Sequence, residues 1–281
     1  MAAELLVLPI GPLRTNVALI GDAARREAIV IDPAIPSLAE LVAALASRGW
    51  CLVLALSTHG HWDHTGELAA LADHVRANEG RELAIAVHPL DRHRLERPRP
   101  MAAPFPIPAV VPTRDLQEGD RITAGEINLR VMHTPGHTEG SISLHDAGAG
   151  ILYSGDTLFQ GAWGRTDLPG GDETAMISSL ARLATLDPST RVIPGHGNAT
   201  RIGDESAWID GVVARAAEHT GARLSGVHVR SVGCSRCEPG PHVMKRTSKC
   251  AAPVPVASVL AALMVASNAP SDVGTPLIVP V

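Results

Sequence analysis

The densest cluster of chemically reactive side chains is the segment STHGHWDHTG, residues 57–66. It places His59, His61, Asp63 and His64 within six consecutive positions, directly after the apolar run CLVLAL. Imidazole and carboxylate groups together suit zinc, iron or manganese. One histidine alone would be read as a polar or capping residue of a turn, but four ligand-type side chains so close together favour a metal site.

Three further ligand-type residues each follow a strand-like run and adjoin a glycine. They are His137 in HTPGHTEGS, Asp156 in YSGDTLF and His196 in VIPGHGN. A neighbouring glycine lets the backbone turn and approach closely. The predicted ligands form two groups: His59, His61 and His137 for one ion, and Asp63, His64 and His196 for the other. Asp156 has two oxygens and can bridge the ions, which at roughly 3.5 Å would share and deprotonate one water molecule.

The other histidines and aspartates considered as ligands have no partner motif. His133 is interpreted as a strand residue or as a residue behind a ligand, and Asp32 in VIDP as structural or as orienting ligand histidines. Arg165 and Asp167 are expected to fix the loop beside the site, with contact to the substrate as the alternative. No substrate-binding residue is predicted. Five histidines are interpreted as surface or capping residues: His74, His88, His93, His145 and His219.

The elements that must position these residues alternate between strand-like and helix-like patterns. Short β-rich runs such as NVALIGD and REAIVIDP open the chain, and later runs lead into each ligand segment. SLAELVAALASRG is a predicted helix with Ser37 as N-cap, Glu40 three residues later and Gly49 at its end. The proline-rich stretch 97–112 predicts an ordered loop, with a lid as one role. Strands on both sides of a midpoint, each half closed by helices, predict an α/β fold, a four-layer αββα sandwich.

Charge and composition exclude several classes of partner. Residues 1–220 carry 18 basic and 27 acidic side chains, whereas residues 221–281 carry six basic and two acidic ones. An acidic body argues against nucleic acid as the main partner. The N-terminus lacks the pattern of a signal peptide, and the apolar run 251–267 contains two prolines and is short for a membrane span. We therefore expect a cytoplasmic protein with no membrane partner.

The pattern of alternating elements ends near residue 222. We predict one domain over residues 1–222 and an atypical, disordered tail over residues 223–281. Only one cysteine lies in the body, so no disulfide framework supports the fold. An alternative for the tail is a small zinc knuckle with these ligands: Cys234, Cys237, His242 and Cys250.

The motifs STHGHWDHTGE, TPGHTEGS, SGDTLF and IPGHG, in this order, resemble the metallo-β-lactamase superfamily over about residues 4–210. The resemblance implies an αββα sandwich with a dinuclear metal site at the edge of the sheets. HWDH and GDTLFQGAWGRTDLPGGD look most like the glyoxalase II (hydroxyacylglutathione hydrolase) branch. Asp156 stands where β-lactamases of this fold commonly place cysteine, which disfavours antibiotic hydrolysis. The tail does not resemble the glutathione-binding region of larger glyoxalase II enzymes, so the thiol carrier stays open.

The resemblance implies a dinuclear metallo-hydrolase that acts on a small-molecule thioester. A metal-bridging hydroxide would attack the carbonyl carbon, with Asp63 as the catalytic residue that orients it. Zinc is the expected metal, with iron or manganese as alternatives. Rival activities of the same superfamily are lactone hydrolysis and persulfide dioxygenation at a single iron, which the residues matching His59, His137 and Asp156 would hold. A non-enzymatic relative that keeps the metals for stability is the remaining alternative, and the oligomeric state is not predicted.

Overall fold

The computed structural model describes residues 3–99, 103–220 and 277–280, all within one compact unit. One large sheet follows the order β15-β1-β2-β3-β4-β5-β6, and a second follows the order β14-β13-β10-β9-β8-β7. The strands of the first sheet are β1 (Glu4–Ile10), β2 (Thr15–Asp22), β3 (Glu27–Ile31), β4 (Cys51–Leu56), β5 (Ala84–Val87), β6 (Arg114–Asp115) and β15 (Leu277–Pro280). Those of the second are β7 (Arg121–Ala124), β8 (Ile127–His133), β9 (Ile142–Asp146), β10 (Ile151–Gly155), β13 (Arg191–Pro194) and β14 (Thr200–Arg201). Strands β11 (Leu158–Phe159) and β12 (Ala162–Trp163) pair with each other.

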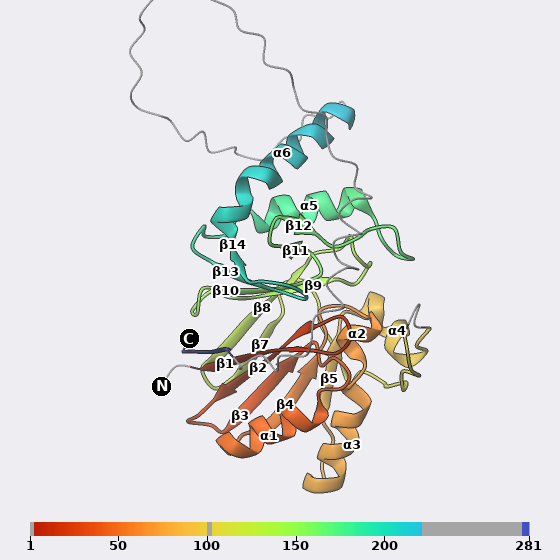
Figure 1. The fold of residues 1–281 in the computed structure, drawn as a ribbon, viewed down its shortest axis with the longest axis vertical. Helices are drawn as coiled ribbons and strands as arrows, with labels where there is room; N and C mark the ends of the chain where they lie inside the picture. Colours follow the sequence, from red (N-terminus) through yellow and green to blue (C-terminus); the bar gives the residue numbers. More distant parts are fainter. Residues whose placement is uncertain (1–2, 100–102, 221–276, 281) are drawn as a thin grey trace, which may run out of the picture. The chain divides into compact units, whose positions relative to one another are not determined.

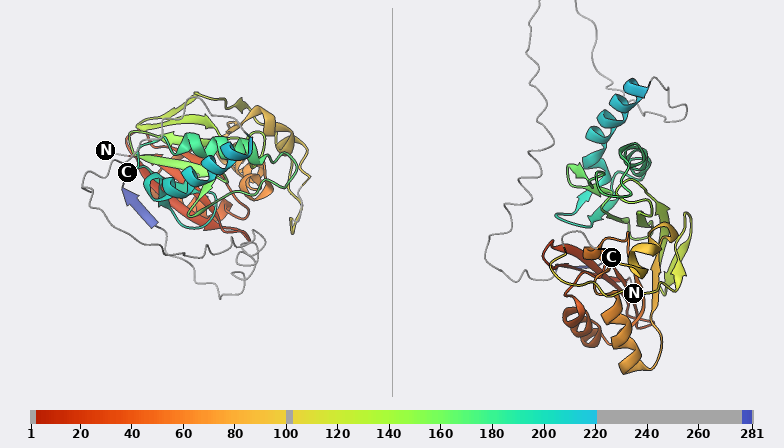
Figure 2. Two further views of the ribbon diagram at one scale, coloured as in Figure 1. Left: turned by 90° about the horizontal axis from the view of Figure 1, so that it is seen from above. Right: turned by 90° about the vertical axis from the view of Figure 1, so that its right-hand side faces the viewer.

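Helices cover the outer face of each sheet. Helices α1 (Leu38–Arg48) and α3 (Leu68–Glu79) lie on the first sheet, and α5 (Glu173–Leu183) and α6 (Ile202–Thr220) lie on the second (Figure 1). Figure 2 shows the same order from above and from the side, with α5 and α6 across the strands of the second sheet. The predicted four-layer αββα sandwich is therefore confirmed. Three short elements complete the fold: α2 (Trp62–Thr65), the 3-10 helix η1 (Pro89–Asp91) and α4 (Arg92–Glu96).

Three layers of aliphatic side chains hold the sandwich together. In β2, Ala18 and Ile20 point into the core between the sheets, whereas Val17 and Leu19 pack toward α1 and α3. Successive side chains of a strand face opposite sides, so the centre of a strand with helices on one face and a sheet on the other is apolar on both faces. Residues 17–20 of β2 fit this requirement, and the polar residues Thr15, Asn16 and Asp22 at its ends are buried as well.

The first helix begins where the sequence predicts but is capped differently. Ser37 is the N-cap of α1, yet its side chain makes no capping hydrogen bond. Its backbone N–H instead donates to Glu67 Oε2 at 2.6 Å, so the predicted pairing with Glu40 is wrong. The tertiary contact replaces the local one because the start of α1 is buried against the segment that precedes α3. Gly49 ends α1 in the left-handed conformation, as predicted.

The predicted tail can be compared with the structure only at its end. The alternative zinc ligands Cys234, Cys237, His242 and Cys250 lie outside the described residues. Leu277–Pro280 forms β15, which pairs antiparallel with β1, and the predicted disorder of the tail stays a prediction. The run LIVP contains β-branched residues that suit the open edge of β1. Residues 103–112 form a loop without helix or strand, as predicted, and no helix of the described segments has the length and apolarity to cross a membrane.

The parallel strands direct four loops toward one edge of the sandwich. Strands β3, β4 and β5 run parallel in the first sheet, and β10 and β13 run parallel in the second. Strand β8 has the same direction as β10, since both are antiparallel to β9. The carboxyl ends of β4, β8, β10 and β13 are each followed by a predicted ligand segment, so the sheets bring these segments to a common edge.

A histidine pair joins the two sheets near this edge. His88 follows β5, and its Nδ1 accepts a hydrogen bond from the backbone N–H of Leu90, which caps η1 as predicted. Its ring stacks on His133 at the end of β8, with 4.2 Å between ring centroids. Burial, assisted by the neighbouring His133, lowers the pKa of His88 to about 4. The folded protein therefore keeps this imidazole neutral in mildly acidic solution.

We predict that His88 makes the folded state sensitive to acid. An unfolded histidine titrates near pH 6.5, so between about pH 6.5 and pH 4 the unfolded chain binds a proton that the folded chain does not, and the free energy of unfolding falls as the pH falls. His88→Asn keeps an acceptor for the Leu90 N–H but cannot be protonated, so its stability should depend less on pH in this window. Urea denaturation at several pH values measures the difference.

The matched control is His93→Asn, which removes an exposed histidine of the neighbouring α4. This variant should show the same pH dependence as the unmodified chain. If His88→Asn and the unmodified chain lose stability in parallel between about pH 6.5 and pH 4, the stacked histidine is not the group that couples folding to protons.

Candidate metal centre

The segment after β4 supplies four of the seven predicted ligands. His59 lies in the loop, His61 is the N-cap of α2, and this one-turn helix carries Asp63 and His64. The hydroxyl of Ser57 donates to the backbone carbonyl of His64 at 2.9 Å and fastens the helix to the end of β4. Helix α2 ends at Thr65 and is separate from α3, which begins at Leu68.

The structure brings all seven predicted side chains together. They come from the loops after β4, β8, β10 and β13, and their candidate ligand atoms form overlapping groups in which all atoms lie within 4.8 Å of one another. The groups are His59, His61 and His137; His59, His64 and Asp156; and Asp63, His64 and His196. We call the first the His59 group and the third the Asp63 group. The second group, which contains Asp156, shares His59 with the first and His64 with the third.

In the His59 group, three imidazoles turn nitrogen atoms toward a common point. His61 Nδ1 lies 3.1 Å from His59 Nε2 and 2.8 Å from His137 Nε2. His137 Nδ1 donates to the backbone carbonyl of Arg165 at 2.7 Å. Because a carbonyl can only accept, the Nδ1 atom of His137 carries the proton and its Nε2 lone pair faces the site.

The Asp63 group repeats this arrangement with a carboxylate. His64 Nε2 and His196 Nε2 lie 3.2 Å apart, and Asp63 Oδ2 lies 3.3 Å and 3.1 Å from them, respectively. His196 Nδ1 donates to the carbonyl of Leu13 at 2.9 Å. His64 Nδ1 lies 3.0 Å from Asp32 Oδ2, although at a poor angle for a hydrogen bond. Both Nδ1 atoms therefore face acceptors, and in the neutral imidazoles both Nε2 lone pairs point at each other and at the carboxylate.

Asp156 lies between the two groups. Its Oδ1 lies 3.4 Å from His64 Nε2, and its Oδ2 lies 3.5 Å from His137 Nε2 and 3.6 Å from His196 Nε2. Oδ1 is buried and accepts no hydrogen bond from any residue that the structure describes. A buried carboxylate oxygen without a donor is costly unless a cation balances it. The donor set therefore fits two divalent ions, with Asp156 able to contact both.

The two groups differ in how their surroundings affect protonation. Burial, together with neighbouring histidines, lowers the pKa of His59 well below its usual value, and burial lowers the pKa of His61 to about 4. Burial alone would also lower the pKa of His64, but the carboxylates of Asp32 and Asp63 raise it well above its usual value. His59 and His61 thus offer neutral imidazoles, whereas the surroundings of His64 favour positive charge.

A glycine permits the close approach at the centre of the site. Gly195 precedes His196, and a Cβ atom there would clash with Asp156 Oδ1 and His64 Cε1. The motif PGHG therefore has a steric role, because its first glycine leaves room for ligands from β10 and α2 to meet.

Other residues singled out in the sequence lie behind the ligands. Asp32 accepts from the backbone N–H of Thr58 at 2.6 Å, from its hydroxyl at 2.8 Å, and approaches His64 as described above. The Arg165 side chain pairs with Asp167 at 2.7 Å, while its backbone carbonyl accepts from His137. His133 lies outside the three groups, and its ring contacts the carbonyl of Glu139.

Sequence reasoning missed Asp91, a buried carboxylate that contacts two ligand segments. The signal that could have found it is the tetrapeptide HPLD directly after the strand-like run LAIAV. Polar residues at the carboxyl ends of strands lie at the same edge as the other ligands.

Comparisons with known proteins agree with this architecture. A sequence model of the metallo-β-lactamase superfamily matches residues 10–196. The hydroxyacylglutathione hydrolase GloC of Haemophilus influenzae is 33% identical over 206 residues, which cover 71% of this chain and 93% of that protein.

Two solved structures share the fold over most of their length. The BLEG-1 B3 metallo-β-lactamase is 33% identical with a TM-score of 0.64, and the match covers 72% of this chain and 95% of that one. TTHA1623, solved in a di-iron-bound form, is 37% identical with a TM-score of 0.61, and the match covers 71% of this chain and 96% of that one. The matched domain, the αββα sandwich and the histidine and aspartate cluster at its edge together show that the chain is a hydrolase of the metallo-β-lactamase superfamily.

Proposed function

We propose that the protein is a thioester hydrolase of the hydroxyacylglutathione hydrolase (glyoxalase II) type. The observation that carries the proposal is the pair of ligand groups on either side of the buried, unpaired oxygen of Asp156. Similarity to GloC, which is named a hydroxyacylglutathione hydrolase, supports the same class of substrate. The acidic charge of residues 1–220 further favours a small-molecule substrate over nucleic acid, and we propose a cytoplasmic location.

The proposed ligands follow from the geometry of the two groups. His59, His61 and His137 would hold one ion, Asp63, His64 and His196 the other, and Asp156 would contact both. When bound, two divalent ions supply a nucleophile at neutral pH and polarise the carbonyl of the substrate. We propose zinc, because imidazole and carboxylate ligands suit it, with iron as the alternative that the di-iron form of TTHA1623 favours and manganese as a third.

The residues of the chain itself would orient the reactants. Asp63 Oδ2 faces His64 and His196, and we assign its Oδ1 to accept a hydrogen bond from the attacking water and hold it in line with the carbonyl carbon. Hydrolysis forms the acyl C–O bond and breaks the C–S bond. The sulfur departs as a thiolate, which needs little protonation because the thiol pKa is about 8.5.

A second candidate, β-lactam hydrolysis, is favoured by the similarity to BLEG-1. It requires the same attack of water on a carbonyl carbon, with an amide nitrogen in place of sulfur as the leaving group. Asp156 weighs against it, because β-lactamases of this fold commonly place cysteine at this position, so a direct comparison of substrates decides between the two activities.

We expect protein purified without added metal to contain two divalent ions per chain. It should hydrolyse a hydroxyacyl-glutathione thioester in preference to a β-lactam or a lactone. It should also turn over the thioester in preference to a persulfide, whose oxidation is measured by oxygen consumption. Asp63→Ala and His64→Ala should each lower kcat/KM for the thioester by about 100-fold or more, because several kcal/mol of transition-state stabilisation depend on the ions that they would hold. Metal analysis and steady-state kinetics provide the measurements.

A control for these variants is Asp115→Ala. It removes an exposed carboxylate of β6 that pairs with Arg92. It should leave turnover unchanged. Unaltered thioester turnover in both Asp63→Ala and His64→Ala would overturn the proposal, and faster turnover of the β-lactam than of every thioester would favour the second candidate instead.

We also expect metal removal to destabilise the fold. The Asp63 group gathers two imidazole nitrogens and a carboxylate oxygen 3.1–3.3 Å apart, and an ion bound to them stabilises the folded state by mass action. Protein treated with a chelator should therefore unfold at a lower temperature, and added zinc or iron should restore the original transition. Differential scanning calorimetry tests this, and an unchanged transition after complete metal removal would show that the cluster folds without cations.

A further inference from the structure

Asp91 is a fully buried carboxylate at the end of η1, outside the seven proposed ligands. Its Oδ2 accepts from the backbone N–H of Gly60 and from the hydroxyl of Thr138, each at 2.7 Å. Its Oδ1 accepts from the backbone N–H of Gly140 at 3.2 Å and from Arg94 Nε at 3.3 Å. Both oxygens are thus saturated by donors from three different segments of the chain.

Two of these donors lie directly beside proposed ligands. Gly60 stands between His59 and His61, and Thr138 follows His137. A single carboxylate oxygen therefore connects the two backbone segments from which all three imidazoles of the His59 group arise. A carboxylate can only accept, so its two oxygens fix the relative position of donors that would otherwise have no common partner.

The surroundings of Asp91 leave little freedom in this connection. A Cβ atom at Gly140 would lie 2.7 Å from the carboxyl carbon of Asp91, so only glycine permits the observed approach. Arg94 offsets the buried negative charge, and its Nη2 donates to Glu139 Oε2 at 2.6 Å and to the carbonyl of Pro169 at 2.9 Å. Buried, fully paired networks of this kind are rigid.

We propose that Asp91 is the positioning residue of the His59 group: it holds the loop of His59 and His61 against the loop of His137, and thereby sets the affinity of this group for its metal ion. The inference rests on the metal ligands assigned under Proposed function but not on the reaction. Gly60 and Thr138 each adjoin ligands of the His59 group. Helix α2, with Asp63 and His64, is fastened separately by Ser57, and His196 contacts Leu13, so we expect the effect to be specific to one of the two ions.

The test is a zinc titration of the metal-free full chain and of Asp91→Asn. An asparagine side chain presents one acceptor oxygen and one NH₂ group, so it cannot accept from both Gly60 and Thr138 on one side and Gly140 and Arg94 on the other. Histidine-ring ¹⁵N NMR follows the two groups separately, through His59, His61 and His137 for one and His64 and His196 for the other.

In Asp91→Asn, the signals of the His59 group should reach their zinc-bound positions only at a free zinc concentration about tenfold or more above that of the unmodified chain. The signals of His64 and His196 should saturate as before. Equal weakening of both groups, or no change in either, overturns the inference. If the unmodified chain binds zinc at neither group, the ligand assignment itself is wrong, which is a separate result.

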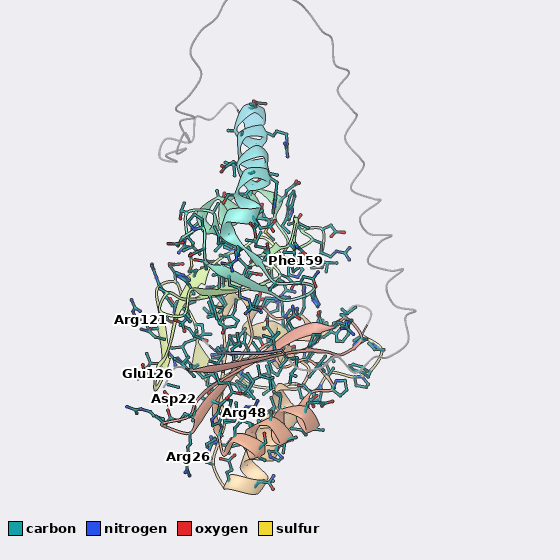
Figure 3. The ribbon with its side chains drawn as sticks, turned by 60° about the vertical axis from the view of Figure 1, so that its left-hand side comes forward. Asp22, Arg26, Arg48, Arg121, Glu126 and Phe159 are labelled. Atoms are coloured by element: carbon teal, nitrogen blue, oxygen red, sulfur yellow. The ribbon has the colours of Figure 1, made fainter. Side chains whose placement is uncertain are left out.

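The matched control is Asp22→Asn. Asp22 is also a buried carboxylate that accepts from backbone N–H groups, those of Ala24, Arg25 and Glu126. Figure 3 shows it beside Glu126 and well separated from Phe159, whose ring lies 6.3 Å from that of His196. Its substitution should leave zinc binding at both groups unchanged, so a general loss of stability is distinguished from a loss of positioning.

A second pair of variants keeps the inference testable if Asp91→Asn does not fold. Thr138→Val removes one donor to Asp91 without changing the size of the side chain, and Thr138→Ser restores a hydroxyl at the same place. Thr138→Val should weaken zinc binding at the His59 group alone, and Thr138→Ser should recover it. Equal binding by the two variants would overturn the role of this hydrogen bond.

Discussion

The crowding of ligand-type side chains at the edge of the sandwich is the constraint on which the rest of the structure depends. The candidate ligand nitrogens of His61 and His137, and of His64 and His196, approach one another to 2.8 Å and 3.2 Å. Carbonyl or carboxylate acceptors on the opposite sides of His137, His64 and His196 leave the Nε2 atoms of these rings facing the cluster. Five imidazoles and two carboxylates can face one another in a buried site only where cations or protons balance them and where the backbone around them is held firmly.

The fold holds the backbone of the site in place because the candidate ligands lie directly after the ends of strands. Two sheets packed face to face by aliphatic side chains hold the paired strands in place up to the edge that carries the ligand segments, where β10 has a register shift between Tyr153 and Gly155. The ligand loops therefore start from fixed positions, and short-range contacts such as Asp32 with Thr58 and Asp91 with Gly60 complete the arrangement. A buried carboxylate that accepts from backbone N–H groups serves each time to tie one loop to another.

Much of this architecture could be predicted from the sequence because local patterns determine it. The four-layer arrangement follows from runs such as NVALIGD, where both faces of the strand are apolar, and the helix end at Gly49 follows from its conformational freedom. The seven side chains that meet at the site could be selected because histidine and aspartate, both metal-ligand types, recur after four strand-like runs. That they meet follows from the strand directions in the structure, which bring the carboxyl ends of β4, β8, β10 and β13 to one edge.

The features that escaped prediction are those in which the partner lies far along the chain. Ser37 is bonded through its backbone to Glu67, 30 residues away, rather than through its side chain to its own helix. Asp91 connects Gly60 and Thr138, which lie on opposite sides of it in sequence. A single aspartate after a strand does not indicate either partner. Strand β15 likewise depends on a distant edge, since four residues of β-forming type specify no partner by themselves.

The spread of the ligands along the chain has a consequence for the order in which the protein can form. The His59 group is complete in sequence at His137, whereas the Asp63 group requires His196 and closes a loop of more than a hundred residues. During synthesis from the N-terminus, the His59 group is complete once His137 is made, well before His196. One metal ion can thus be captured by a partly made chain, and the arrival of the second completes a crosslink between the first sheet and the loop after β13 of the second.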